Sequence, residues 1–330
     1  MIGSFILALA IAFLLAVVAG IILIPVLRRL KAGQSIKENG PVWHMHKQGT
    51  PTMGGLIFIP AVVLTTLGLW MKELAAGELA HVAMLVLALI FGAIGFLDDF
   101  EKVKKKGNTG LTALPKFLLQ LAAALAFLLV LRLEGYITPN LYIPFFNVSV
   151  KLPEVVYFIL AAFIVVGTVN AVNITDGVDG LLTGVTLPVA IFFAFAAWKW
   201  GMRVQGVFAA ALAGSLGAFL IFNFNPAKVF MGDTGSLFIG GAVCAMAFSM
   251  DMPLVLVPLG MVYIIETLSD IIQVIYFKLT HGKRIFKMAP IHHHFEKCGW
   301  SEKKVFVVFT GASIVFAVIA WLGVMFRYSA

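Results

Sequence analysis

Long apolar segments alternate with short polar segments along most of this chain. Ten apolar segments are close to the roughly 20 mostly apolar residues that a helix needs to cross a bilayer. They are Ile2–Leu27, Met53–Met71, Leu79–Leu97, Pro115–Leu131, Val155–Val172, Leu181–Trp198, Val207–Phe222, Leu237–Met250, Pro253–Phe277 and Val305–Phe326. Asp251 and Pro253 divide the eighth segment from the ninth, and the two together would be too long for a single span. The pattern predicts an all-α polytopic membrane protein with ten transmembrane helices in one domain, residues 1–330.

The composition agrees with this pattern and excludes other classes of protein. Hydrophobic residues make up 61% of the chain and charged residues 12%, and the mean hydropathy is +1.00. A soluble domain is about half apolar and about a quarter charged. The net charge of +8 does not indicate nucleic-acid binding, because the basic residues lie between apolar segments rather than on one globular face. The two cysteines suggest neither a disulfide framework nor a zinc site.

Lysine and arginine set the predicted orientation, because cytoplasmic loops carry an excess of them. Of these 24 residues, 18 fall in or beside the loops that follow the odd-numbered segments. Those loops are therefore expected to be cytoplasmic, with both termini on the outer side. The longest outer loop, Glu134–Pro153, alternates partly between apolar and polar residues over Phe145–Leu152, which predicts a small β-hairpin.

Two adjacent carboxylates, Asp98 and Asp99, stand where the third apolar segment ends, with Lys102 and Lys104–Lys106 behind them. Neighbouring anions repel each other unless a cation lies beside them, so a divalent metal or a protonated partner would fit here. The simpler interpretation is a helix end that reaches water, followed by a solvated run of charge. Polar residues in the other cytoplasmic loops favour the functional interpretation.

The first cytoplasmic loop ends in Lys47 followed by several glycines, among them Gly54 and Gly55. Glycines let backbone N–H groups approach an anion closely, and a lysine adds a mobile cation. This pattern is consistent with an anion-binding loop. A plain turn leading into the second segment is the alternative.

The third cytoplasmic loop has almost no basic residue but carries Asn173, Asp176 and Asp179. Their spacing of three residues would place them on adjoining faces of one helical turn. The alternative is a pair of tight turns, because each aspartate precedes a glycine. Carboxylates in an apolar passage are costly unless they are hydrated or paired, so we favour a functional role.

The fourth cytoplasmic loop places Asp233 between glycines, where a carboxylate can point into a cleft. Phe230 offers a flat face on which a nucleobase could stack, and the Asn223 amide could recognise the edge of a base. Ordinary packing is the alternative for Phe230.

The fifth cytoplasmic loop contains three consecutive histidines, His292, His293 and His294. Consecutive side chains cannot all face one way, so they do not form a simple single-face metal site. At neutral pH they are adaptable donors that suit a diphosphate or its leaving group.

The ninth segment carries Tyr263, Glu266, Asp270 and Gln273 on one helix face. Ionisable groups at membrane depth are candidates for function. A structural polar stripe that ties helices together is an equally good interpretation.

Five motifs in these loops resemble those of a known enzyme family. They are KQGTPTMGG from Lys47, LDDFEKVKKKGNTGL from Leu97, NAVNITDGVDGL from Asn170, FMGDTGS from Phe230 and APIHHHFE from Ala289. Through all its segments and cytoplasmic loops the chain is similar to bacterial phospho-N-acetylmuramoyl-pentapeptide transferases. These enzymes belong to the polyprenyl-phosphate N-acetylhexosamine-1-phosphate transferase superfamily. The aspartate motifs are shared across the superfamily, whereas APIHHHFE and KQGTPTMGG point to the peptidoglycan branch.

The resemblance implies transfer of phospho-MurNAc-pentapeptide from UDP-MurNAc-pentapeptide to undecaprenyl phosphate, giving lipid I and UMP with Mg²⁺ as cofactor. The active site would lie at the cytoplasmic face of the bacterial cytoplasmic membrane. The lipid bilayer is an expected partner, nucleic acid is not, and a homodimer is one oligomeric state that we consider. The implied catalytic residues are Asp98, Asp99, Asp233, His292, His293, His294 and Lys47, with Asp233 as the metal ligand. The implied substrate-binding residues are Asn173, Asp176, Asp179, Asn223, Phe230 and Lys116.

Two chemical schemes and two other functions stay open at this point. The lipid phosphate could attack the donor directly, which we prefer, or a carboxylate could attack first and form a covalent intermediate. A relative that uses UDP-GlcNAc would share the same fold and chemistry. A transporter of nucleotide sugars or ions is suggested by Glu266 and Asp270, but no internal repeat is visible and most polar residues gather at one face.

Overall fold

The computed structural model describes residues 1–30, 47–76, 80–105, 107 and 110–328, and most of them are helical. The elements are α1 Ile2–Arg29, α2 Gly55–Leu69, α3 Met71–Ala75, α4 Ala80–Lys104, α5 Ala113–Leu133, β1 Asn140–Ile143, β2 Val148–Lys151, α6 Glu154–Thr175, α7 Leu181–Lys199, α8 Arg203–Asn223, α9 Gly232–Ser249, the 3₁₀ helix η2 Pro253–Val255, α10 Leu256–Leu259, α11 Met261–Leu279, α12 Ile291–Lys297 and α13 Glu302–Val324. Each predicted apolar segment contains a helix, so the all-α class is confirmed.

Seven helices in the described part of the chain are long and apolar enough to cross a membrane, which confirms a polytopic membrane protein. They are α1, α4, α5, α6, α7, α8 and α13. The segment η2–α10 and the helix α11 would add an eighth span if they count as one, although the chain bends by 77° between them. Helix α2 has only 15 residues, and α9 begins with the polar sequence GDTGS. The number of ten spans therefore stays a prediction.

Helix α9 lies at the centre of the bundle. Every residue from Thr234 to Ser249 is buried, and α9 packs against α4, α6 and α2. A Cβ atom on Gly240 would lie 2.7 Å from the Cα atom of Val169 in α6, so only a glycine permits this contact. In contrast, α1 and α13 are each only 22% buried over their apolar windows, as expected for helices that face lipid. Small residues in α9 thus let the surrounding helices close around it.

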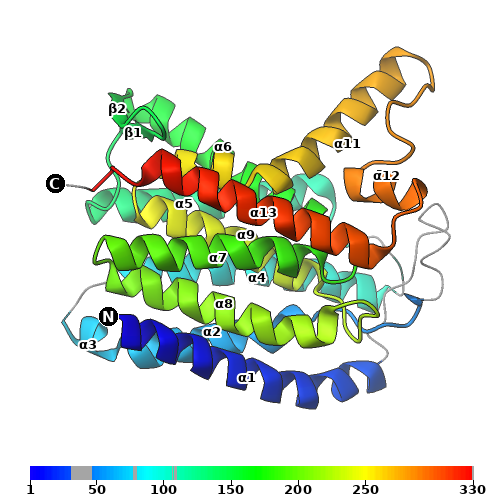
Figure 1. Ribbon diagram of the computed structural model, residues 1–330, viewed down its shortest axis with the longest axis horizontal. Helices are drawn as coiled ribbons and strands as arrows, with labels where there is room; N and C mark the ends of the chain where they lie inside the picture. The colour runs from blue at the N-terminus through cyan, green and yellow to red at the C-terminus, as the bar shows by residue number, and fades with distance from the viewer. Residues whose placement is uncertain (31–46, 77–79, 106, 108–109, 329–330) are drawn as a thin grey trace.

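The two ends of the bundle carry different structures. Figure 1 shows both termini at the end that holds β1 and β2, whereas α12 lies at the other end. The strands pair antiparallel, with Asn140 opposite Lys151 and Ile143 opposite Val148, so the predicted hairpin is confirmed. The stretch Phe145–Leu152 supplies only its second strand, because Phe145 and Asn147 adopt positive φ angles in the turn. Termini at one end agree with an even number of crossings.

Helix α11 leaves the bundle at an angle. Figure 1 shows it leaning away from the other helices, and the chain returns from its far end to α12, where His292 contacts Glu266 in the first half of α11. The 77° bend falls at Gly260, two residues after Pro258. Proline and glycine are common causes of such breaks, since proline lacks an N–H donor and glycine stabilises a helix poorly. The bend places the polar face of α11 against α12 and the preceding loop.

The arrangement of the two ends generates a topology prediction. Single cysteines at Gly107 and at Ser149, each in a Cys298→Ser background, should react with a membrane-impermeant maleimide from opposite sides of the membrane. Gly107 follows α4 and Ser149 lies in the hairpin. The remaining Cys244 is buried and should stay unlabelled in the parent protein, which serves as the control. Labelling of both positions from the same side would contradict the orientation derived from lysine and arginine.

Candidate active site

Three carboxylates from two helices lie together. Asp98 and Asp99 stand near the C-terminal end of α4, and Asp233 is the second residue of α9. Each contributes one oxygen to a group in which these atoms lie within 4.8 Å of one another. A Cβ atom on Gly95 would lie 2.0 Å from the carbonyl oxygen of Asp233, so α4 and α9 can approach this closely only with glycine there. The predicted meeting of these acids therefore follows from the contact between the two helices.

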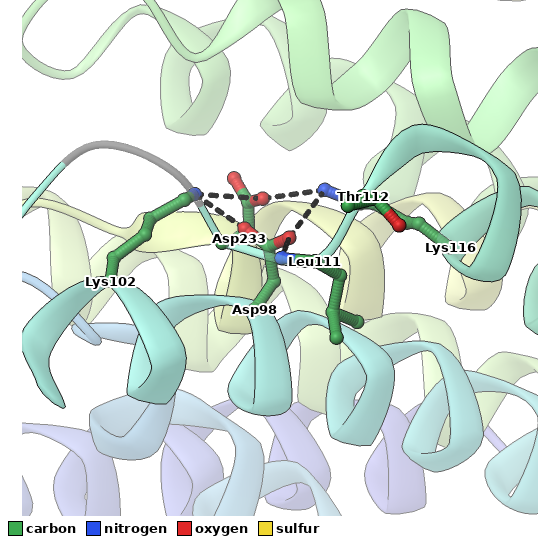
Figure 2. A pocket seen from close by; sticks show the side chains of 7 residues that line it. Asp98, Lys102, Leu111, Thr112, Lys116 and Asp233 are labelled. Atoms are coloured by element: carbon green, nitrogen blue, oxygen red, sulfur yellow. Dashed lines mark hydrogen bonds and ion pairs between the residues drawn. The ribbon is translucent and has the colours of Figure 1, made fainter. Parts of the chain in front are cut away.

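Two lysines neutralise most of the charge of this cluster. The Nζ atom of Lys102 lies 2.6 Å from Asp98 and 3.1 Å from Asp233. The Nζ atom of Lys116 lies 2.7 Å from Asp233, and Figure 2 shows the two lysines on opposite sides of the carboxylates. Burial opposes ionisation of Asp233, but the ammonium groups of Lys102 and Lys116 outweigh it and lower the pKa of Asp233 below its usual range. Asp233 is therefore ionised at neutral pH.

These side chains line an open pocket of about 360 Å³ (Figure 2). Its lining residues are Asp98, Lys102, Gly110, Leu111, Thr112, Lys116 and Asp233. The backbone N–H of Leu111 donates to Asp98 at 3.0 Å and holds the segment before α5 against the acids. Such a pocket offers lysines to a phosphate and carboxylate oxygens to a cation.

Asp99 has a different environment from its two neighbours. It accepts hydrogen bonds from the backbone N–H of Asp233 at 3.1 Å, from the N–H of Thr234 at 2.8 Å and from the Thr234 hydroxyl at 2.7 Å. These N–H groups belong to the first turn of α9, where Met231 provides no side-chain cap. Asp99 thus caps α9 from another helix and balances the positive end of its dipole. These hydrogen bonds position Asp233, which lies in the same turn. The assignment of Asp99 as a catalytic residue stays a prediction.

Asn173, near the end of α6, joins this cluster, and its assignment to substrate binding stays a prediction. Its amide nitrogen donates to Asp233 at 3.0 Å and to the Ser236 hydroxyl at 2.7 Å. The Ser236 hydroxyl in turn donates to the carbonyl of Gly232 at 3.1 Å. Asp233 is therefore held by lysines on one carboxylate oxygen and by an amide on the other.

The predicted helical turn through Asn173, Asp176 and Asp179 is wrong. Helix α6 ends at Thr175, and α7 starts after Gly180, whose φ of +75° requires a left-handed backbone. The two aspartate–glycine pairs form turns, which is the alternative reading, and so the three side chains diverge. Asp176 stays near the acid cluster, and burial together with the charges of Asp233, Asp99 and Asp179 raises its pKa to about 8.

Asp179 and Lys47 form a second ionic cluster with Glu302, the first residue of α13. The Nζ atom of Lys47 lies 2.7 Å from Asp179 and 2.5 Å from Glu302. Asp179 also accepts hydrogen bonds from the Asn225 amide at 3.2 Å and from the N–H of Ala227 at 2.9 Å. Lys47 and Asp179 are 8% and 4% exposed, so this cluster is a buried junction between four segments of the chain.

The glycines after Lys47 do not form the expected anion-binding loop. The N–H of Gly54 donates to the carbonyl of Phe230 at 2.8 Å, and the N–H of Gly55 donates to the carbonyl of Met231 at 3.0 Å. The N–H of Phe230 donates back to the carbonyl of Pro51 at 2.8 Å. The motif thus holds the segment before α9 by backbone pairing, and its lysine binds carboxylates. The preceding residues 44–46 lie outside the described part of the chain.

Asn223 and Phe230 flank the loop before α9. Asn223 is 3% exposed, its amide oxygen accepts from the Thr183 hydroxyl at 3.1 Å, and its nitrogen donates to the carbonyl of Val229 at 3.0 Å. The amide oxygen therefore ties Asn223 to α7, and the amide nitrogen supports the loop. The Phe230 ring is partly exposed. Contact of either residue with a nucleobase stays a prediction.

The three histidines have different partners, which confirms that they do not share a face. His292 is 1% exposed, and its Nδ1 atom lies 2.9 Å from Glu266 of α11. The Nδ1 atom of His293 lies 2.6 Å from Glu296. The Nδ1 atom of His294 accepts a hydrogen bond from the backbone N–H of Lys287 at 3.1 Å. Only the His292 ring is buried beside the turn after α6, where a Cβ atom on Gly177 would lie 2.1 Å from it.

The polar face of α11 serves several local contacts. The Tyr263 hydroxyl lies 2.9 Å from the Thr186 hydroxyl, and Gln273 accepts from the N–H groups of Ile285 and Phe286 at 3.2 and 2.9 Å. Together with the contact of Glu266 to His292, these bonds tie α11 to α7 and to the last cytoplasmic loop. These contacts show that Tyr263, Glu266 and Gln273 tie helices and loops together, as the interpretation as a structural polar stripe predicts.

Three residues of these clusters carry little signal of their role in the sequence. Lys102 belongs to a run of lysines that is typical of a solvated helix end, although its spacing of four from Asp98 is the spacing of a helical ion pair. Glu302 resembled an ordinary first-turn acid of a helix, and no local signal connects it to Lys47, 255 residues earlier. Glu266 was noted only as a member of the polar stripe. The contacts of all three join residues from the five predicted cytoplasmic loops at one end of the bundle.

Two family models match the chain. The model described as Glycosyl transferase family 4 matches residues 81–251, a range that includes Asp98, Asp99 and Asp233. The model described as Phospho-N-acetylmuramoyl-pentapeptide-transferase signature 1 matches residues 47–59, which contain KQGTPTMGG.

Curated relatives match the chain over nearly its whole length. A phospho-N-acetylmuramoyl-pentapeptide-transferase of Clostridium acetobutylicum is 44% identical, covering 98% of this chain and 100% of the relative. One from Clostridium perfringens is 48% identical, covering 96% of this chain and 95% of the relative. One from Geobacillus kaustophilus is 47% identical, covering 96% of each. These relatives confirm the resemblance drawn from the five motifs.

The raised pKa of Asp176 generates a stability prediction. Between its ordinary value of 3.8 and about 8, the folded protein keeps a proton on Asp176 that the unfolded chain has released. The stability contributed by this proton is complete below the ordinary value and is lost as the pH rises to about 8. Asp176→Asn, which mimics the protonated form, should therefore gain thermal stability relative to the wild type as the pH rises. Thermal unfolding in detergent with a metal chelator measures this; a difference in Tm that is constant with pH would contradict it.

Proposed function

This chain belongs to the phospho-N-acetylmuramoyl-pentapeptide-transferase family, and on that premise we propose that it transfers phospho-MurNAc-pentapeptide from UDP-MurNAc-pentapeptide to undecaprenyl phosphate. The products are lipid I and UMP. The observation that carries the proposal is the ionic pocket of Asp98, Asp233, Lys102 and Lys116. Its lysines can bind the phosphates of a nucleotide sugar, and its carboxylates can bind a metal ion that accompanies them. The full-length similarity to transferases with this name supports the choice of substrates.

The position of the pocket suits one lipid substrate and one soluble substrate. It is open, and it lies where the apolar helix α4 ends and α5 begins. A polyprenyl chain can stay in the bilayer while its phosphate reaches this level, and a nucleotide sugar can approach from water. An enzyme that joins the two must place its reacting groups at such a boundary.

We propose Mg²⁺ as the cofactor of this site. Carboxylate oxygens are the ligands that Mg²⁺ prefers, and three of them lie within 4.8 Å of one another here. Asp98 and Asp233 line the pocket, whereas Asp99 faces the first turn of α9, so Asp233, with Asp98 beside it, would hold the ion. When bound, the ion would offset negative charge on the diphosphate of the donor.

Lys102 and Lys116 would also offset the negative charge of the donor diphosphate. Lys102 and Lys116 present ammonium groups to the pocket, where they can bind the phosphates of donor and acceptor. Phosphoryl transfer needs positioning and charge stabilisation more than covalent chemistry from the protein. The phosphorus–oxygen bond to UMP would break as the lipid phosphate oxygen attacks the phosphorus next to the sugar.

The environment of Asp98 favours direct attack over a covalent enzyme intermediate. One carboxylate oxygen of Asp98 accepts from the N–H of Leu111 at 3.0 Å, and the other lies 2.6 Å from Lys102. Both contacts withdraw electron density and make the carboxylate a poor nucleophile. A lipid phosphate with a second pKa near 6 is largely dianionic at neutral pH, so it needs little help from a base.

The donor specificity of the purified protein tests the proposal. With polyprenyl phosphate and Mg²⁺, radiolabelled UDP-MurNAc-pentapeptide should give an organic-soluble product and UMP, whereas UDP-GlcNAc at equal concentration should give negligible product. The cations of the last cytoplasmic loop can meet carboxylates of the peptide, and GlcNAc has none. Asp98→Asn is the negative control. Preferential formation of a GlcNAc phospholipid would contradict the substrate assignment and leave the reaction class standing.

The metal assignment makes a separate prediction. Asp233→Asn keeps the shape of the side chain but removes the charge, so it should lower turnover by about two orders of magnitude or more and raise the Mg²⁺ concentration for half-maximal rate. Glu101→Gln is the matched control, because Glu101 pairs with Lys105 at the surface of the same helix end. It should keep the wild-type rate and metal response. A wild-type Mg²⁺ response in Asp233→Asn would show that the ion is held elsewhere.

A further inference from the structure

The contact between Glu266 of α11 and His292 of α12 is the most deeply buried ionisable pair described in this structure. Glu266 is 0% exposed and His292 is 1% exposed. One Glu266 oxygen lies 2.9 Å from the Nδ1 atom of His292 and 3.5 Å from its backbone nitrogen. A carboxylate without water is costly unless it is paired, so this contact is a strong constraint on the imidazole.

The opposite edge of the same ring has no partner. The Nε2 atom of His292 is buried and makes no hydrogen bond in the described part of the chain. It faces the turn after α6, since a Cβ atom on Gly177 would lie 2.1 Å from it. The adjacent residue in that turn is Asp176, which lies close enough to Asp233 and Asp99 to interact with their charges. Buried polar atoms are normally hydrogen-bonded, so the unbonded Nε2 atom of His292 is available to bind a ligand or a proton.

We propose that Glu266 is a positioning residue for His292 and fixes which ring nitrogen faces the reaction. Glu266 accepts a hydrogen bond from Nδ1–H, which keeps the proton on Nδ1 and directs Nε2 to the turn at Gly177. This inference rests on the proposed function for its catalytic meaning, but the geometry of the pair stands independently. Hydrogen-bonded carboxylates set the tautomer of functional imidazoles in this way in unrelated enzymes.

The neighbouring histidine has the opposite arrangement. The Nδ1 atom of His294 accepts from the N–H of Lys287, so in its neutral form its proton lies on Nε2. His292 and His294 are thus predicted to be different tautomers, although they are two residues apart. The sequence motif therefore contains chemically distinct groups rather than three equivalent donors.

The charge of Glu266 also affects what Nε2 can do. A carboxylate at Nδ1 stabilises the imidazolium, in which Nε2–H can donate to a phosphate oxygen. Other ionisable groups lie on the elements packed against His292: Asp176 and Asp179 in the turn, His293, His294, Glu296 and Lys297 on its own helix, Asp270 on α11, and Glu302, Lys303 and Lys304 at the start of α13. Among the described groups, Glu266 alone forms a hydrogen bond to the ring, so loss of its charge should affect His292 first.

Nitrogen-15 spectroscopy of histidine-labelled protein tests the tautomer directly. We expect pyrrole-like Nδ1 and pyridine-like Nε2 signals for neutral His292, and the reverse for neutral His294. Loss of signals in His292→Gln and His294→Gln assigns them. A neutral His292 with its proton on Nε2 would overturn the proposal, whether or not the protein proves to be a transferase.

Kinetics of Glu266→Gln test the consequence for turnover. We expect kcat to fall roughly 10-fold to 100-fold, with little change in the KM for the nucleotide donor and a shifted pH profile. Asp270→Asn is the matched control, because it removes a carboxylate one turn further along α11 and should keep wild-type kinetics. Glu266→Asp should recover part of the rate, and unchanged thermal unfolding of each variant excludes a folding defect. A wild-type kcat and pH profile in Glu266→Gln would overturn the positioning role, whereas an inactive wild type would instead refute the proposed function.

Discussion

The capping of α9 by Asp99 is the interaction on which the rest of this site depends. The first turn of a helix leaves N–H groups without partners, and here a carboxylate from α4 accepts two of them at 3.1 and 2.8 Å. This bond fixes the end of α9 against α4, and that contact sets Asp233 beside Asp98. Lys102, Lys116 and Asn173 then converge on Asp233 from three other positions. One helix terminus, buried at the membrane surface, thus organises charges from three helices.

Much of the fold could be predicted because membrane helices are encoded locally. Each of the ten apolar segments contains a helix, and the hairpin and the gathering of polar loops at one end were also expected. The count of spans did not follow, because α2 has only 15 residues and the chain bends by 77° before α11. Hydropathy reports length and composition, whereas bends and burial depend on neighbouring helices.

The acids of the site could be predicted, but their partners could not. A carboxylate at the end of an apolar helix is conspicuous in a sequence, so Asp98, Asp99 and Asp233 stood out. The partners of the acidic residues come from distant parts of the chain. Asp179, for example, binds Lys47, which is 132 residues away. Gly54 and Gly55 were misread because a free backbone N–H and one that pairs with a distant loop look the same in sequence.

The two lysines beside the three carboxylates have a consequence for the biogenesis of the protein. A newly inserted chain must assemble these acids at the membrane surface before any substrate arrives, and repulsion among them would oppose that assembly. Because Lys102 and Lys116 supply the opposing charge from within the chain, the site can form without a ligand and persist while it waits for one. The ammonium groups of the same two residues would then bind the phosphates of incoming substrates. Lys102 and Lys116 would therefore serve both the assembly of the site and the recognition of its substrates.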